Sequence, residues 1–269
     1  MNSLPLAQKN QALGDWLLAH GPLVVAFSGG VDSGFLWARA RQVLGNRAPA
    51  CLVKGPSLPA WDLASAQEFA QGLNAPLEVI PVSAEAAPEI WVNNPDRCHH
   101  CKTLNYQVIQ DRAKAQGWGQ IVDGTNLDDH ADYRPGLKAA ALAGVASPLA
   151  LVGLSKNEIR HLAREMGLSL WDKPSSPCLN SRVPYGQAIT PQKLSQIEQG
   201  EAWLLAKGFR GFRLRHHGEI ARLELAESDL AQALAQRAEI NQFIKSLGFA
   251  FVTLDLGGYS PGPFNPKTP

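Results

Sequence analysis

A continuous apolar run that leads directly into a glycine-rich turn constrains the fold of this chain more than any other feature. Residues 23–27 (LVVAF) predict a strand buried on both faces, as in a parallel sheet. The turn Ser28-Gly29-Gly30-Val31-Asp32-Ser33 follows, and a helical pattern continues to about residue 44. This order of elements predicts the first unit of an α/β fold, with an anion-binding site at the turn.

The residues of this turn suit a nucleotide phosphate. Gly29 and Gly30 permit a tight turn and let backbone N–H groups approach an anion closely. The helix N-terminus carries partial positive charge, and Ser28 and Ser33 add hydroxyl donors. Asp32 would be repelled by phosphates unless a cation intervened, so we interpret it as a Mg²⁺ ligand. The alternative, a serine-capped turn, requires neither the double glycine nor Asp32.

The same alternation of strands and helices continues to about residue 170. Further strands are predicted at 50–53, 77–80 and 120–123, with a short fifth at 146–149. Helices are predicted at 4–20, 59–73, 102–116 and 155–166, the last opened by a capping box of Ser155 and Glu158. Residues 1–170 are therefore expected to form a parallel sheet with helices on both faces.

The pattern changes after residue 170. Residues 171–188 are rich in Pro and Ser and are predicted to form a linker that carries Cys178. Residues 189–257 predict a small α+β domain, and residues 258–269 a loose tail. Within the small domain we expect helices at 191–207 and 228–247 and strands at 211–216, 219–225 and 250–256.

Composition narrows the class of protein. A hydrophobic fraction of 45% with 18% charged residues excludes disorder. The net charge of +1 gives no indication of a nucleic-acid or membrane partner. The chain shows no apolar run long enough for a membrane span and no visible signal peptide, and its four cysteines are too sparse for a disulfide scaffold. We therefore expect a cytoplasmic protein.

Three cysteines have a spacing typical of metal ligands. Cys98 and Cys101 form a Cys-x-x-Cys at an expected helix start, and Cys178 lies in the linker. A structural zinc site normally has four ligands, which His99 or His100 would complete. A [4Fe–4S] cluster held by three cysteines leaves one iron open. The spacing leaves zinc, iron–sulfur and uncoordinated thiols open, whereas the fourth cysteine, in the apolar run 50–53, is expected to be a buried core residue.

Two levels of family resemblance follow from these motifs. The turn at 28–33 resembles the pyrophosphate loop (PP-loop) of the N-type ATP pyrophosphatases, which implies an adenine nucleotide alpha hydrolase-like fold and cleavage of ATP between its α- and β-phosphates. The segment 171–186 (WDKPSSPCLNSRVPYG) resembles the LarE-type sulfur transferases, and so do segments 124–136, 213–218 and 254–259. The tail departs from that family, because Tyr259 is followed by Ser-Pro-Gly-Pro where Arg-Ser-Gly-Ser is expected.

The resemblance implies a reaction and its cofactors. LarE-type enzymes adenylate a carboxylate of pyridinium-3,5-biscarboxylic acid mononucleotide and convert it to a thiocarboxylate, in the biosynthesis of the nickel-pincer nucleotide cofactor. The three-cysteine form implies ATP, Mg²⁺ and a [4Fe–4S] cluster that carries sulfide, with inorganic sulfide or a sulfur donor as co-substrate. It also implies a homo-oligomer. In the other form of the family, the single cysteine at position 178 is sacrificed.

The same resemblance, with the chemistry of the residues, assigns roles to individual positions. The predicted catalytic residues are Cys178, Asp32 and Lys102. The predicted nucleotide-binding residues are Ser28, Gly29, Gly30, Val31, Asp32, Ser33, Val53, Gly124, Thr125 and Asn126. The predicted [4Fe–4S] ligands are Cys98, Cys101 and Cys178, and the predicted substrate-phosphate residues are Arg213, Arg215 and Arg182. Arg213 and Arg215 alternate on one strand and so face the same side, which also suits a solvated strand surface.

Three other functions compete with this interpretation. A tRNA-thiolating PP-loop enzyme would need a basic RNA surface, which a net charge of +1 does not favour. An amide-forming ligase such as NAD synthetase would leave the three cysteines unexplained. A non-catalytic adenine-nucleotide sensor with structural zinc would bind zinc without iron or sulfide.

Overall fold

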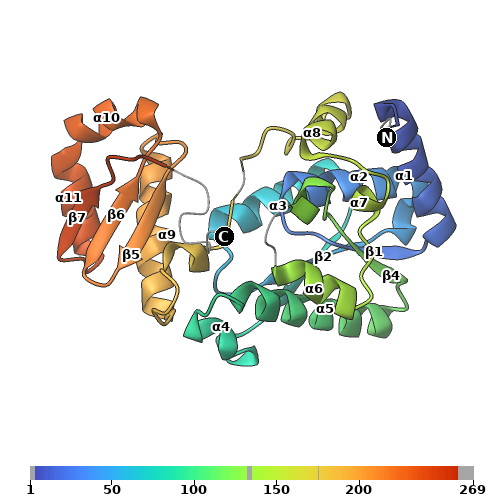
Figure 1. The fold of residues 1–269 in the computed structure, drawn as a ribbon, viewed down its shortest axis with the longest axis horizontal. Helices are drawn as coiled ribbons and strands as arrows, with labels where there is room; N and C mark the ends of the chain where they lie inside the picture. The colour runs from blue at the N-terminus through green and yellow to red at the C-terminus, as the bar shows by residue number, and fades with distance from the viewer. Residues whose placement is uncertain (1–3, 132–134, 175, 260–269) are drawn as a thin grey trace. The chain divides into compact units, whose positions relative to one another are not determined.

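The computed structural model describes residues 4–131, 135–174 and 176–259 (Figure 1). These residues form two compact units, each built from separate stretches of chain. The N-terminal unit comprises Met1–Gly55, Ala60–Ala87 and Cys98–Ser176, and the C-terminal unit comprises Pro56–Pro59, Pro88–Arg97 and Pro177–Pro269. The boundary after residue 176 falls inside the predicted linker. Of the loose tail expected at 258–269, residues 260–269 lie outside the described chain, as do the motif residues 132–134.

The N-terminal unit contains the predicted parallel sheet. Its four strands are β1 (Leu23–Ala26), β2 (Ala50–Lys54), β3 (Leu77–Pro81) and β4 (Gln120–Asp123), in the order β3-β2-β1-β4. The apolar runs become strands because β1, at the centre, is covered on both faces, and Leu23, Val24 and Val25 are fully buried. The expected α/β class is confirmed.

Helices cover both faces of this sheet (Figure 1). They are α1 (Leu6–His20), α2 (Val31–Leu44), α3 (Ala60–Gly72), α5 (Arg97–Gln116), α6 (Pro135–Leu142), α7 (Pro148–Leu151) and α8 (Lys156–Glu165). On one face, α5 and α6 pack against Val24 and Cys51. On the other, the ring of Phe27 lies 5.2 Å from Trp37 of α2 and 5.6 Å from Phe69 of α3. Right-handed crossovers explain this arrangement, because the chain moves from β1 toward β3 over one face and returns to β4 over the other.

Two element predictions are corrected by the structure. The predicted fifth strand at 146–149 is a single bridge between Ala146 and Val122, and Pro148 then begins α7. Proline at the first position of a helix loses no intrahelical hydrogen bond, so it favours this start. The helix predicted from residue 102 begins at Arg97, which brings both cysteines of the Cys-x-x-Cys into its first two turns.

The C-terminal unit is a three-stranded sheet with helices. Its strands are β5 (Arg213–His217), β6 (Ile220–Glu224) and β7 (Phe251–Leu254), and its helices are α4 (Glu89–Val92), α9 (Pro191–Ala206), α10 (Leu230–Ala235) and α11 (Arg237–Ser246). Strand β6 pairs antiparallel with β5 and parallel with β7. The single helix predicted at 228–247 is wrong, because the backbone of Gln236 separates α10 from α11.

No helix in the described ranges combines the length and the apolar character needed to cross a membrane.

Candidate nucleotide and sulfur-transfer site

The glycine turn follows β1 at the carboxyl edge of the sheet. Chain connections leave β1 and its neighbour β4 in opposite directions, and such a switch point is where open α/β sheets bind ligands. Gly29 has φ +78°, a conformation that favours glycine. The Ser33 hydroxyl closes the turn, because it lies 3.0 Å from the Ser28 hydroxyl and accepts a hydrogen bond from the Ser28 N–H at 3.2 Å. The predicted phosphate loop is therefore a preformed turn at the switch point.

The N-terminus of α2 faces open space beside Gly30. A Cβ atom built on Gly30 would have the Ser28 hydroxyl, 3.6 Å away, as its one neighbour within 4 Å. The protein itself therefore does not require glycine there, whereas a closely approaching phosphate would. The helix starts at Val31, and its first N–H groups have no partner within the helix. This arrangement fits a phosphate bound on backbone amides.

Asp32 lies in the first turn of α2, and its two carboxylate oxygens have different surroundings. Oδ2 forms an ion pair with Lys156 at the start of α8. Oδ1 is buried and has no hydrogen-bond partner among the described residues. Burial raises the pKa of Asp32, although the Lys156 ammonium opposes that shift. An orphaned carboxylate oxygen beside an anion site fits a Mg²⁺ ligand. Lys156 was not predicted from the sequence to serve the site, because its pairing with Asp32 joins residues far apart in the chain.

The segment after β4 packs directly against the phosphate loop. A Cβ atom on Gly124 would lie 2.5 Å from the backbone nitrogen of Ser33, so only glycine fits. Thr125 donates from its hydroxyl to Asp123 Oδ2 at 2.9 Å. Asn126 is buried, and its side-chain oxygen accepts from the N–H of Asp128 at 2.9 Å. These predicted nucleotide residues thus shape the edge of the site through contacts within the protein.

Asp123, which the sequence analysis did not single out, is the centre of a polar cluster. Its carboxylate accepts from the hydroxyls of Tyr106 and Ser147, each at 2.7 Å, and from Thr125. The Lys102 ammonium lies 4.0 Å from Asp123 Oδ2, with 42% of its side chain exposed. Burial and the nearby carboxylate raise the pKa of Tyr106, which keeps this donor protonated. Asp123 therefore holds Lys102 at the carboxyl edge of β4.

Val53, also predicted to bind nucleotide, occupies the fourth position of β2. Its side chain packs against the apolar cluster under α5 and α6.

The cysteines divide between the two units. Cys98 is exposed and Cys101 half-buried; they lie three residues apart on α5, so they share one side of the helix. Cys178 is half-buried in the C-terminal unit, immediately before a short 3₁₀ helix at Leu179–Arg182. Cys51 is buried in β2, as expected. Within the part of the chain that the structure describes, no three His, Cys, Asp or Glu side chains form a group that could hold a metal ion.

Hydrogen bonds inside the C-terminal unit join the segments next to these cysteines. The Asn93 side-chain amide donates to the carbonyls of Pro184 at 2.8 Å and Gln187 at 2.9 Å. Arg97 donates to the side-chain oxygen of Asn93 and, at 3.1 Å, to the carbonyl of Asn180. Arg97 directly precedes Cys98, and Asn180 follows Cys178 by two residues. Arg97 flanks the Cys-x-x-Cys and was weighed from the sequence as a group near an anionic sulfur or as a surface charge, whereas here it is buried and bonded within the protein. Asn93 carried no motif and was not predicted.

Arg182 and Arg215, which were predicted to bind the substrate phosphate, form buried ion pairs within the protein. Arg182 is 1% exposed and binds Glu201 through two hydrogen bonds of 2.9 and 2.8 Å. It also donates to the carbonyl of Cys178 at 3.1 Å. Arg215 is buried and binds Glu224 in the same bidentate manner, at 3.0 and 2.8 Å. Neither glutamate could be predicted from the sequence, because nothing local marks either of them as a partner of an arginine.

Arg213 is less buried than Arg182 and Arg215. Its side chain is half-buried and stacks on Tyr259, with the guanidinium carbon 4.8 Å from the ring centre. Burial lowers its pKa, and the neighbouring Arg182 adds to that shift. Its guanidinium donates to the Phe212 carbonyl at 2.6 Å and to the Tyr259 hydroxyl at 3.1 Å. A half-buried arginine next to a second guanidinium is suited to an anionic ligand.

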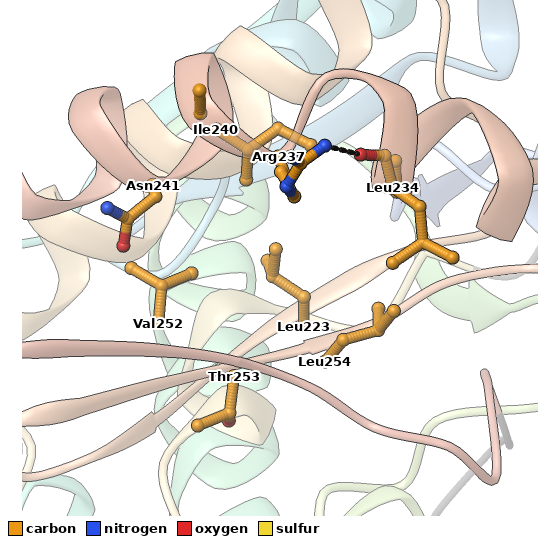
Figure 2. A pocket seen from close by; sticks show the side chains of 10 residues that line it. Leu223, Leu234, Arg237, Ile240, Asn241, Val252, Thr253 and Leu254 are labelled. Carbon is orange, nitrogen blue, oxygen red and sulfur yellow. Dashed lines mark hydrogen bonds between the residues drawn. The ribbon is translucent and has the colours of Figure 1, made fainter.

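The C-terminal unit also contains an apolar pocket of about 430 Å³ between α10, α11, β6 and β7 (Figure 2). Leu223, Val252 and Leu254 project into it from the strands, and Leu234 from α10. None of the predicted site residues lines it. Its chemistry does not suit a nucleotide phosphate.

A phosphate loop at the switch point of a parallel sheet defines a nucleotide-binding α/β protein of the PP-loop class. No family model matches the chain. It is 36% identical over 244 residues to pyridinium-3,5-bisthiocarboxylic acid mononucleotide synthase of Lactiplantibacillus plantarum, covering 90% of this chain and 88% of that protein. It is 39% identical to an uncharacterized protein of Synechocystis, covering 90% and 91%. A tRNA-specific 2-thiouridylase, MnmA, of Leptospira interrogans is 28% identical over 59% of this chain and 52% of that enzyme.

The chain belongs to the LarE family of PP-loop sulfur transferases. Membership confirms the family predicted from the sequence and implies ATP and Mg²⁺ as cofactors.

Proposed function

We propose that this enzyme adenylates a carboxylate of pyridinium-3,5-biscarboxylic acid mononucleotide with ATP and replaces the activated oxygen with sulfur. The product is the thiocarboxylate used for the nickel-pincer nucleotide cofactor. The observation that carries the proposal is the preformed Ser28–Ser33 turn at the switch point, in a chain similar over 90% of its length to a synthase of the bisthiocarboxylic acid mononucleotide.

The N-terminal unit would carry out the adenylation. The substrate carboxylate attacks the α-phosphorus of ATP, an O–P bond forms, and pyrophosphate leaves. The amides of Gly29, Gly30 and Val31 and the hydroxyls of Ser28 and Ser33 would bind the phosphates. Asp32 would hold Mg²⁺, which when bound neutralises charge on pyrophosphate. Lys102, held by Asp123 and exposed to solvent, would stabilise the α-phosphate or an anionic sulfur.

Sulfur transfer would be the second step, because AMP is a good leaving group on the adenylated carboxylate. A sulfur nucleophile attacks the acyl carbon, a C–S bond forms, and the C–O bond to AMP breaks. Cys98, Cys101 and Cys178 would hold a [4Fe–4S] cluster, which when bound offers an open iron for an exchangeable sulfide. The thiols fit this group because all three are at least partly exposed and two of them share a helix side. Arg97 supports the proposal by bracing the chain next to both segments.

The three arginines that were predicted to bind the substrate phosphate would have different roles. We assign the substrate phosphate to Arg213, a half-buried residue whose guanidinium stacks on Tyr259. Arg182 and Arg215 contribute by holding the segment around Cys178 and Ser181, since each donates to a main-chain carbonyl there. We further propose that the enzyme acts in the cytoplasm as a homo-oligomer, with inorganic sulfide or a sulfur donor as co-substrate.

Product analysis tests the adenylation. The enzyme should release AMP and pyrophosphate in the presence of Mg²⁺ and the mononucleotide substrate. Asp32→Ala should lower the rate by about 10²–10³-fold, the usual loss when a charge-stabilising group is removed. Asp15→Ala, at an exposed helix position, is the control. Release of ADP and phosphate instead would refute the proposal.

Anaerobic purification with iron and sulfide assays tests the sulfur site. Cys98→Ala, Cys101→Ala and Cys178→Ala should each abolish iron binding, whereas Cys51→Ala should retain it. With sulfide supplied, the wild type should make several thiocarboxylates per chain. A single turnover, with Cys178 losing the mass of hydrogen sulfide and no iron bound, would show a sacrificial cysteine instead.

The likeness to MnmA favours tRNA thiolation as a second candidate, over 59% of the chain. Incubation with tRNA, ATP and sulfide, followed by nucleoside analysis, distinguishes the two, because the proposed enzyme leaves tRNA unmodified.

A further inference from the structure

Lys173, in the Trp-Asp-Lys-Pro segment, reaches back to the phosphate loop. Its ammonium lies 3.0 Å from the Gly29 carbonyl oxygen, 3.0 Å from Asp62 Oδ1 and 3.3 Å from the Ser65 hydroxyl. All four residues belong to the N-terminal unit. The Lys173 and Asp62 side chains are 17% and 9% exposed, so the contacts are largely shielded from water. None of these residues except Gly29 was predicted to serve the nucleotide.

The surroundings hold this ammonium in one place. Asp62, in the first turn of α3, also accepts from the Ser176 hydroxyl at 2.6 Å. Arg160 of α8 donates to the main-chain carbonyls of Trp171 at 2.8 Å and Lys173 at 2.7 Å. The segment is thus bonded on both sides, and Lys173 has little freedom to turn elsewhere.

The contact to Gly29 determines the direction of a loop amide. In a trans peptide the carbonyl oxygen and the following N–H point in opposite directions. When Lys173 holds the Gly29 oxygen, the Gly30 N–H must point away from Lys173. The space beside Gly30 is open, and the N-terminus of α2 starts there. The peptide is therefore turned so that its donor is available to an anion.

A direct bond from Lys173 to phosphate does not fit the same geometry. An ammonium group has three donors, and the carbonyl, carboxylate and hydroxyl oxygens account for all three.

We infer that Lys173 is a positioning residue of the nucleotide loop, which it orients through the Gly29 carbonyl while Asp62 anchors its ammonium. This inference rests on the proposed binding of ATP at residues 28–33. It makes the segment leading to Cys178 part of the nucleotide site.

Calorimetric binding of α,β-methylene-ATP with Mg²⁺ tests the inference without turnover. Lys173→Met should raise the Kd about tenfold, the effect of losing one hydrogen bond to a charged group. Lys9→Met is the matched control, because Lys9 is also buried and bonds a carboxylate, Glu158, and a glycine carbonyl, Gly153. It should change the Kd by less than about twofold, since it has no contact with the loop.

Asp62→Asn separates positioning from direct binding and serves if Lys173→Met does not fold. An anchor role predicts weaker nucleotide binding, because the released ammonium no longer holds Gly29. A direct phosphate contact predicts equal or tighter binding, because a repelling carboxylate is removed. Amide hydrogen exchange in the peptide 27–33 should be faster in both loop variants and unchanged in Lys9→Met.

The outcomes for the two proposals differ. Wild-type protein that fails to bind the analogue refutes ATP binding at the loop. Wild type that binds, with unchanged affinity in Lys173→Met or with equal or tighter binding in Asp62→Asn, overturns the positioning role alone.

Discussion

A buried ion pair between Arg182 and Glu201 supports the Cys178 segment in the C-terminal unit. Glu201 and Arg182 are each 1% exposed, and Glu201 also accepts from the Leu214 N–H at 3.0 Å. Glu201→Ala leaves the guanidinium buried without its carboxylate and removes the acceptor of a strand N–H. Arg182, which also donates to the Cys178 carbonyl, then loses both hydrogen bonds that fix its other guanidinium nitrogens.

The cost follows from the burial of both partners. Removing one member of a buried pair destabilises a protein by about 3–5 kcal/mol, because an uncompensated charge stays inside. At about 2–4 °C per kcal/mol, a loss of about 4 kcal/mol lowers Tm by roughly 8–16 °C. Glu239→Ala breaks an exposed pair with Lys207 in the same unit and should cost about 1 kcal/mol or less.

Urea unfolding followed by circular dichroism measures the free-energy differences, and thermal unfolding followed in the same way measures Tm. The double variant Arg182→Met/Glu201→Leu should be more stable than Glu201→Ala, because it removes both charges and fills the volume with apolar atoms. The reasoning is wrong if Glu201→Ala costs no more than Glu239→Ala, or if the double variant is the least stable of the set.

Two further predictions follow from burial and close packing. Gly124→Ala should raise the Kd for nucleotide at least about tenfold and lower the free energy of unfolding by about 1–3 kcal/mol, because the new Cβ would collide with the first turn of α2. Gly72→Ala is the control, because a Cβ there meets no atom within 4 Å, and it should not weaken binding. Calorimetry measures the Kd, and urea unfolding measures the stability. Burial raises the pKa of Cys51 to about 12, so its thiol stays protonated at pH 8. In cluster-free protein, mass spectrometry should find Cys51 unmodified by iodoacetamide until urea unfolds the chain, while the exposed Cys98 reacts in the folded state.

The parallel sheet and the phosphate loop could be predicted because their signals are local. An apolar run such as 23–27 suits a strand covered on both faces, and the glycine turn before a helical pattern is a short-range feature. The capping box at Ser155 and Glu158 was confirmed for the same reason. Element ends were less certain: the helix predicted from residue 102 starts at Arg97, and the strand predicted at 146–149 is one bridge.

Sequence alone thus determined the fold class, the family and the identity of the loop, because the hydrophobic pattern and the motif residues are local features of the chain. Tertiary structure decided the partners of the charged side chains. Arg182 and Arg215 looked suited to phosphate, but the fold buries them against Glu201 and Glu224. A buried charge needs a specific counter-charge, and which residue supplies it depends on how distant segments pack.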